Sequence, residues 1–145
     1  MGRRLDIDRL LNQLEAAPQA LDPLYVVMGD EPLLVTEATD GLRSAARRAG
    51  YLERTSLMLD ARGDWSAVIA ATQNISLFGD RRLVEVKIPT GKPGKTGSET
   101  LIKLAGLTQS GALSDTLVLV GLPRLDKATR NSKWAGALLD AATLI

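Results

Sequence analysis

Two short, almost purely apolar runs, residues 24–28 and 116–120, constrain the fold of this chain more than any other feature. A run of this length without alternating polar positions is typical of a strand that is buried on both faces. Such strands occupy the interior of parallel sheets, where helices cover both faces. Turn residues follow each run, beginning at Gly29 and at Gly121. The two runs therefore predict an α/β fold.

Helical patterns and further strands alternate along the rest of the chain. Strands are expected at residues 55–59 and 83–88, and partial alternation in the second predicts one more exposed face. Helices are expected after the N-cap residues Asp6, Asp30, Asp64 and Ser98, and around residues 132–139. The alternation predicts a three-layer domain with a mostly parallel sheet and right-handed crossovers. Residues 1–140 are expected to form this domain, and residues 141–145 to begin a following one.

Apolar residues at helical spacing predict the buried face of each helix. In the helix after Asp30 they are Leu34, Ala38, Leu42, Ala45 and Ala49. In the short helix after Asp64 they are Trp65, Val68, Ile69 and Thr72. Trp65 and Trp134 are both expected in the core. Arg43, Arg47 and Arg48 are expected on a solvated face that complements the helix dipole.

The composition excludes several kinds of active site. The chain has neither cysteine nor histidine, so disulfides, thiolate metal sites and imidazole bases are excluded. Its net charge of +1 is too balanced for tight electrostatic binding of nucleic acid, so DNA contact is expected only indirectly, through partners. No apolar segment follows Arg3 and Arg4, and no window approaches ~20 apolar residues. These features predict neither signal peptide nor membrane span, and a cytoplasmic protein.

Residues 89–96 resemble a nucleotide-binding loop, because they end in Gly94, Lys95 and Thr96. The full pattern is G-x-x-x-x-G-K-[ST], in which the first glycine permits backbone amides to surround the phosphates. Here Pro89 replaces that glycine, and Pro93 removes another N–H donor. No acidic residue follows residues 116–120 to hold magnesium. The pattern favours a basic surface loop, and a P-loop ATPase that uses Lys95 and Thr96 is the alternative.

The turn after the first strand, residues 28–32, is the other place where a doubly wound ATPase would hold phosphate. It has one glycine, no lysine and two carboxylates, which would repel phosphate. The sequence therefore indicates an ATPase-shaped domain without ATPase chemistry.

Leu77 and Phe78, the chain's single phenylalanine, lie at the break between the short helix and the strand expected at 83–88. Bulky apolar residues at such a break either plug the core or bind another protein. Trp65 and Val68 already mark the inward face of the helix, so Leu77 and Phe78 need not both follow it. This context favours an exposed Leu-Phe pair that binds another protein over a pair that is buried in the core.

Several motifs along the chain are specific when they occur together. They are Tyr25-Val26-Val27-Met28-Gly29-Asp30-Glu31-Pro32-Leu33-Leu34, Asp64-Trp65, Ser76-Leu77-Phe78, and Leu125-Asp126-Lys127 with Asn131-Ser132-Lys133-Trp134. Taken together, they resemble the N-terminal domain of the delta subunit of the bacterial DNA polymerase III clamp loader, and the resemblance covers most of the chain. The resemblance implies an AAA+-like member of the RecA-like nucleotide-hydrolase fold that has lost its phosphate-binding machinery. The Gly-Lys-Thr loop departs from the family pattern.

The resemblance also implies a role in DNA replication. Members of the family bind the ring-shaped sliding clamp (beta) and open it for loading on primed DNA, while other subunits supply ATP energy. The implied partners are therefore the clamp and the delta prime and gamma/tau subunits. No catalytic activity, cofactor or metal is implied for this domain, although it belongs to a nucleotidyltransferase holoenzyme.

The family's clamp-binding element is a Leu-Phe pair that enters a hydrophobic pocket of the clamp. Leu77 and Phe78 match that pair, and Ile75 and Ser76 match its flanking positions. Arg81 and Arg82 follow, where they either pair with acidic groups of the clamp or lie on a solvated strand edge. A docking subunit that never touches the clamp is a further alternative.

Overall fold

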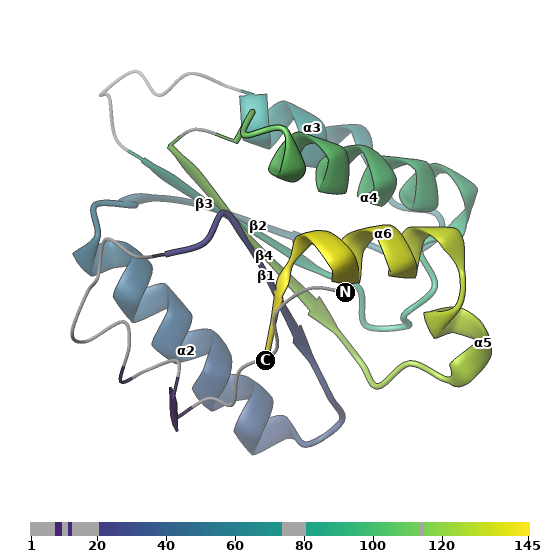
Figure 1. Ribbon diagram of the computed structural model, residues 1–145, viewed down its shortest axis with the longest axis horizontal. Helices are drawn as coiled ribbons and strands as arrows, with labels where there is room; N and C mark the ends of the chain where they lie inside the picture. The colour runs from purple at the N-terminus through teal and green to yellow at the C-terminus, as the bar shows by residue number, and fades with distance from the viewer. Residues whose placement is uncertain (1–7, 10–11, 13–20, 74–80, 114) are drawn as a thin grey trace.

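A computed structural model describes residues 8–9, 12, 21–73, 81–113 and 115–145, and within them one parallel sheet has the strand order β2-β3-β4-β1-β5 (Figure 1). The strands are β1 (Leu24–Met28), β2 (Glu53–Met58), β3 (Arg82–Lys87), β4 (Thr116–Leu122) and β5 (Thr143–Leu144). The two apolar runs are neighbours: β1 pairs with β4 from Leu24–Val118 to Met28–Leu122. Every strand pair is parallel, which confirms the predicted sheet type.

Helices cover both faces of the sheet. They are α2 (Pro32–Arg48), α3 (Ser66–Gln73), α4 (Gly94–Gln109), α5 (Lys127–Arg130) and α6 (Lys133–Ala141). Figure 1 shows α2 on one face, and α3, α4 and α6 on the other. The chain runs from β1 to β2 at one edge of the sheet, and then back through β3 and β4 to β5 at the other edge. Because the direction reverses and each crossover is right-handed, the helix between β1 and β2 lies on the opposite face from the helices of the later connections. The three-layer prediction is confirmed.

The core has one apolar cluster on each face of the sheet. Along β1, Leu24 and Val26 belong to the cluster under α3, α4 and α6, whereas Tyr25 and Val27 belong to the cluster under α2. This division follows from the alternation of side chains along a strand. Trp65 and Trp134 are both buried in the first cluster, as predicted.

The start of α2 differs from the sequence-based expectation. Glu31 is the N-cap, and its carboxylate accepts a hydrogen bond from the Leu33 N–H at 3.3 Å. Asp30 instead accepts one from the Arg124 N–H at 2.9 Å, which ties the β1–α2 turn to the loop after β4. Leu34 is 55% exposed and lines a cavity of about 250 Å³ at the end of β1, so its predicted burial is wrong. Ala38, Leu42 and Ala45 are buried as predicted, whereas Ala49 is half-buried.

The start of α4 also differs. The helix begins at Gly94, earlier than a cap at Ser98 predicts, and Ser98 lies inside its first turns. The Ser98 hydroxyl donates a hydrogen bond to the Gly94 carbonyl at 2.6 Å instead of capping backbone amides. Packing of Gly94 and Gly97 on neighbouring residues therefore outweighs the weak helix propensity of glycine.

The short helix α5 was not expected from the sequence. Asp126 is its N-cap and accepts a hydrogen bond from the Thr129 N–H at 2.7 Å. This hydrogen bond to backbone is the main reason that the pKa of Asp126 lies below its usual value. The cap lies within the 125–134 motif, so that motif has a local structural role.

The N-terminal helix is described in part. Asp8, Arg9 and Asn12 are helical and exposed. The apolar residues predicted for this helix, Ile7, Leu10, Leu11 and Leu14, and its predicted cap Asp6, lie outside the described residues. No helix in the described part of the chain is long and apolar enough to span a membrane.

Candidate functional site

The predicted binding residues Ile75, Ser76, Leu77 and Phe78 lie outside the described residues, but the structure describes both flanks of this segment. On one side α3 ends at Gln73, and on the other β3 begins at Arg82. The segment therefore connects two elements that both pack in the core.

Arg82 connects the two flanks directly. Its Nη1 donates a hydrogen bond to the Ala71 carbonyl in the last turn of α3, at 2.8 Å. Its Nη2 pairs with Oε2 of Glu53 on β2 at 3.0 Å, and the side chain is only 12% exposed. The end of α3 is thus tied to the start of β3 by a charge-assisted contact. Arg82 is not the solvated edge residue that the sequence indicates.

Arg81, the first described residue after the segment, is also engaged within the chain. Its Nε lies 3.4 Å from Oδ1 of Asp115, and its guanidinium lies 5.5 Å from the centre of the Tyr51 ring. Cation–π contacts of this geometry are favourable. Arg81 is nevertheless exposed, as expected for a solvated strand edge.

The inward face of α3 is occupied by described residues. Val68, Ala71 and Thr72 are buried, and Ile69 is half-buried. The Thr72 hydroxyl donates to the Ile69 carbonyl at 2.8 Å, which satisfies its polar group internally. Trp65 precedes the helix and donates its indole N–H to the Asp60 carbonyl at 2.8 Å. The predicted inward face is confirmed for Trp65, Val68 and Thr72.

Two backbone amides of the Gly-Lys-Thr loop, which a phosphate site would need, already make hydrogen bonds within the chain. The Gly91 N–H bonds to the Ile88 carbonyl at 3.0 Å, and the Lys92 N–H bonds to the Thr90 hydroxyl at 3.2 Å. Lys95 and Thr96 lie exposed in the first turn of α4. The loop follows β3, whereas the switch point of strand order lies at β1.

Packing accounts for the glycines of this loop. Gly94 has a positive φ of 76° and lies against Ala61, where a Cβ would come 2.9 Å from the Ala61 Cβ. Gly97 lies against Trp65, where a Cβ would come 2.5 Å from the indole ring. The sequence pattern therefore reflects close contacts with the 61–65 segment, which the sequence alone does not reveal.

Replacing Gly97 with alanine is expected to lower the free energy of unfolding by about 1–3 kcal/mol, because the added methyl overlaps a buried ring. Gly106 on the same helix provides a matched control, since a Cβ added there would meet no neighbouring group within 4 Å. Gly106→Ala should raise the free energy of unfolding by about 0.5–1 kcal/mol. Urea denaturation measures both changes. Equal stabilisation by the two substitutions would contradict the packing explanation.

A cavity of about 360 Å³ lies at the carboxyl ends of β1, β3 and β4, on the face covered by α2. Parallel sheets bind ligands at such an edge, near the switch point. The cavity lining contains one carboxylate, Asp40, which pairs with Arg43 at 3.3 Å. The described residues contain no group of three or more acidic side chains arranged to hold a metal ion. The described lining thus combines the single carboxylate of Asp40 with the cations Arg43 and Lys87.

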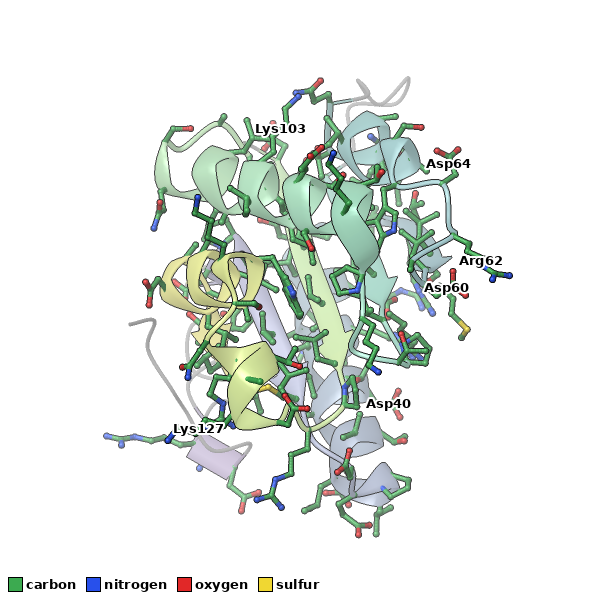
Figure 2. All side chains as sticks on the ribbon, turned by 90° about the vertical axis from the view of Figure 1, so that its right-hand side faces the viewer. Asp40, Asp60, Arg62, Asp64, Lys103 and Lys127 are labelled. Atoms are coloured by element: carbon green, nitrogen blue, oxygen red, sulfur yellow. The ribbon has the colours of Figure 1, made fainter. Side chains whose placement is uncertain are left out.

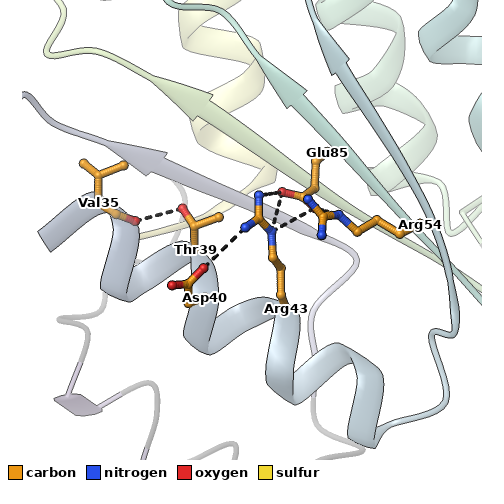
Figure 3. A network of polar contacts seen from close by, with 6 residues as sticks. All are labelled: Val35, Thr39, Asp40, Arg43, Arg54 and Glu85. Carbon is orange, nitrogen blue, oxygen red and sulfur yellow. Dashed lines mark hydrogen bonds and ion pairs between the residues drawn. The ribbon is translucent and has the colours of Figure 1, made fainter. Parts of the chain in front are cut away.

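A buried carboxylate network joins α2 to the sheet beside this cavity (Figure 3). Glu85 on β3 is 2% exposed, which contradicts the exposed face predicted for residues 83–88 at this position, whereas Lys87 on the same face is exposed. Arg43 donates Nε to both Glu85 oxygens, at 2.8 and 3.0 Å, and Nη2 to Oε1 at 2.6 Å. Arg54 on β2 places its Nε 2.5 Å from Glu85 Oε2. Two arginines thus compensate one buried negative charge.

Hydrogen bonding to Glu85 is the main reason that the pKa of Arg43 is raised above its usual value, although burial opposes the shift. Arg43 therefore does not lie on the solvated face expected for Arg43, Arg47 and Arg48, whereas Arg47 and Arg48 are exposed as expected. Sequence reasoning missed the pairing. The available signal was the single glutamate within the otherwise apolar part of β3.

The chain is similar to known replication proteins. A family model described as DNA polymerase III, delta subunit, matches residues 25–145. The DNA polymerase III subunit delta of Escherichia coli K12 is 30% identical over 142 residues, which are 98% of this chain and 39% of that protein. The subunit delta of Haemophilus influenzae Rd is 24% identical over 116 residues, covering 80% of this chain and 32% of that protein. The chain therefore spans well under half the length of these relatives.

Proposed function

The chain belongs to the DNA polymerase III delta subunit family, and on that premise we propose that it binds the sliding clamp through Leu77 and Phe78 and opens the ring for loading on primed DNA. The observation that carries this proposal is the family match, which spans the Leu-Phe segment. The other loader subunits, delta prime and gamma/tau, are the proposed further partners, and DNA is met only through the assembled loader.

The frame around the segment supports this proposal. Arg82 ties the last turn of α3 to the start of β3, so the segment between them begins and ends at fixed points. A short element held at both ends loses less conformational freedom on binding than a free loop. The inward face of α3 is also occupied by Val68 and Thr72, which are both buried.

Ring opening requires no chemistry from this chain. A binder opens the clamp if it has higher affinity for a distorted ring than for the closed ring. The ATP that drives the cycle is then consumed by other loader subunits. The proposed role is therefore mechanical, and the AAA+-like sheet serves as a rigid holder for the Leu-Phe segment.

Binding of purified sliding clamp to this chain, measured by surface plasmon resonance, tests the proposal. Saturable binding that competes with a Leu-Phe peptide of the clamp-binding segment is the expected result. Absence of saturable binding would instead favour a subunit that only docks other loader proteins.

Titration of the chain with ATP and magnesium tests the ATPase alternative. We expect no saturable heat in isothermal titration calorimetry, because the Gly91 and Lys92 amides are already bonded and Asp40 is paired. Lys95→Ala is the matched control, and it should behave like the unchanged chain. Micromolar binding that Lys95→Ala abolishes would show a nucleotide site and contradict the mechanical role.

A further inference from the structure

An arginine-lined hollow of about 480 Å³ opens at the C-terminal end of α2, beside the edge strand β2. We call it the arginine hollow. Its lining residues are Arg43, Ser44, Arg47, Tyr51, Leu52, Arg54 and Leu83. Three of these are cations and none is acidic, in a chain whose net charge is only +1. The described lining of this hollow is therefore rich in cations.

Buried Glu85 holds two of these arginines in place. It pairs with Arg43 and Arg54 together, and Asp40 also pairs with Arg43, so these two arginines face two carboxylates and the remaining positive charge of the hollow is that of Arg47. Arg54 uses its Nε for this pair and is 50% exposed, and no second ion pair joins it to any described residue. A guanidinium that one carboxylate already holds in place is preorganised to bind a further carboxylate or phosphate in a bidentate manner.

Arg47 adds a third cation without a partner of its own. Its exposed side chain has neither a hydrogen bond nor an ion pair with a described residue, and the hydroxyl of Ser44, three residues earlier, likewise has no hydrogen bond to a described residue. Leu52 is 60% exposed at the rim. The hollow thus offers Arg47 and Arg54 as free donors beside a small apolar surface, which is the composition of an interface rim.

The arginine hollow lies next to Arg81, the first described residue after the Leu-Phe segment. Tyr51 lines the hollow, and the guanidinium of Arg81 lies over its ring at 5.5 Å. Arg81 directly follows the segment 74–80. The residue that follows this segment therefore packs on the lining of the hollow, so a protein bound by the segment would lie near the hollow.

We propose that the arginine hollow binds carboxylates on the surface of the same protein that Leu77 and Phe78 bind. This inference rests on the proposed function, because the proposed partner is the clamp. The site is a single compact hollow next to a protein-binding segment, whereas a nucleic-acid groove needs cations distributed along a phosphate backbone. Charge pairing of this kind chiefly accelerates association and orients the partners.

The test compares clamp association of the full chain with that of Arg47→Glu, in stopped-flow experiments at two ionic strengths. At low salt Arg47→Glu should lower the association rate constant about 10-fold, and leave the dissociation rate constant nearly unchanged. The difference should shrink at high salt, because exposed charges are screened. Arg47→Lys keeps the charge and should associate at nearly the original rate.

Lys103→Glu is the matched control for net charge. Lys103 is exposed on α4, on the opposite face of the sheet from Asp40 and α2 (Figure 2). It should change the association rate constant far less than Arg47→Glu does. Equal melting temperatures of the two variants would show that neither effect comes from unfolding.

Three results would overturn the inference. If clamp binding depends on Leu77 and Phe78 but Arg47→Glu behaves like Lys103→Glu, the hollow is not part of the interface and the proposed function survives. If Arg47→Glu leaves clamp association unchanged but weakens binding of a fluorescent single-stranded oligonucleotide, the hollow is a phosphate site. If the unchanged chain does not bind the clamp, the proposed function fails and the inference fails with it.

Discussion

Replacing Leu77 and Phe78 together with alanine is expected to weaken clamp binding by ~3–5 kcal/mol and to leave the free energy of unfolding nearly unchanged. Burial of one Leu and one Phe in a pocket contributes about 1.5–3 kcal/mol each, which makes the pair a hot spot. The fold should persist because the inward face of α3 is filled by Val68 and Thr72. Calorimetric titration of the clamp measures the affinity, and thermal unfolding measures the stability.

A matched control is available at the start of α2. Leu33 and Leu34 are 64% and 55% exposed, so Leu33→Ala with Leu34→Ala removes a comparable apolar pair from another part of the surface. This control should bind the clamp as the unchanged chain does. If instead the Leu77-Phe78 variant loses cooperative unfolding before it loses binding, the pair is a plug in the core and the proposed binding role is wrong.

The fold was predictable from sequence because its main signal is local. Residues 24–28 and 116–120 are apolar without alternation, and they became β1 and β4, paired in the interior of the sheet. Strand order was not predictable in the same way. It depends on which strands meet across long connections, and single-sequence periodicity carries no information on that choice.

The local predictions that failed were decided by tertiary contacts. Aspartate is a favourable N-cap residue, but the carboxylate of Asp30 accepts a hydrogen bond from the backbone N–H of Arg124 instead, and Glu31 caps α2. Gly94 looks like part of a phosphate loop, but it permits contact with Ala61, and Gly97 in the following helix permits contact with Trp65. The Leu-Phe segment was assigned by resemblance, and its residues lie outside the described structure, so its contact with the clamp stays a prediction.

Glu85 is another residue whose environment is decided by tertiary contacts that the sequence does not show. A glutamate within a strand suggests a solvated face, yet this carboxylate is buried because Arg43 and Arg54, from two other elements, converge on it. Burial of a charge is tolerated when it is paired and hydrogen-bonded. Sequence separation hides such a pairing, since Arg43 lies 42 residues from Glu85.

Removing this charge should be among the most destabilising single changes in the chain. Glu85→Gln is expected to lower the free energy of unfolding by ~2–4 kcal/mol, because Arg43 and Arg54 lose the anion they share. Breaking a fully buried pair costs about 3–5 kcal/mol. The range expected for Glu85→Gln is lower because the side chains of Arg43 and Arg54 are 27% and 50% exposed, so water can solvate part of each guanidinium. Guanidinium denaturation monitored by tryptophan fluorescence measures the change.

Two further variants distinguish the effect of burying the Glu85 charge on stability from the effect of losing any ion pair. Glu53→Gln removes a carboxylate that also pairs with an arginine, but whose side chain is 29% exposed, and it should cost about 1 kcal/mol or less. Glu85→Leu combined with Arg43→Leu replaces the more buried of the two pairs by apolar groups. It should be less destabilising than Glu85→Leu alone, since no partly buried Arg43 is left uncompensated. If the double variant is the less stable of the two, the network stabilises α2 by its hydrogen bonds and not by charge compensation.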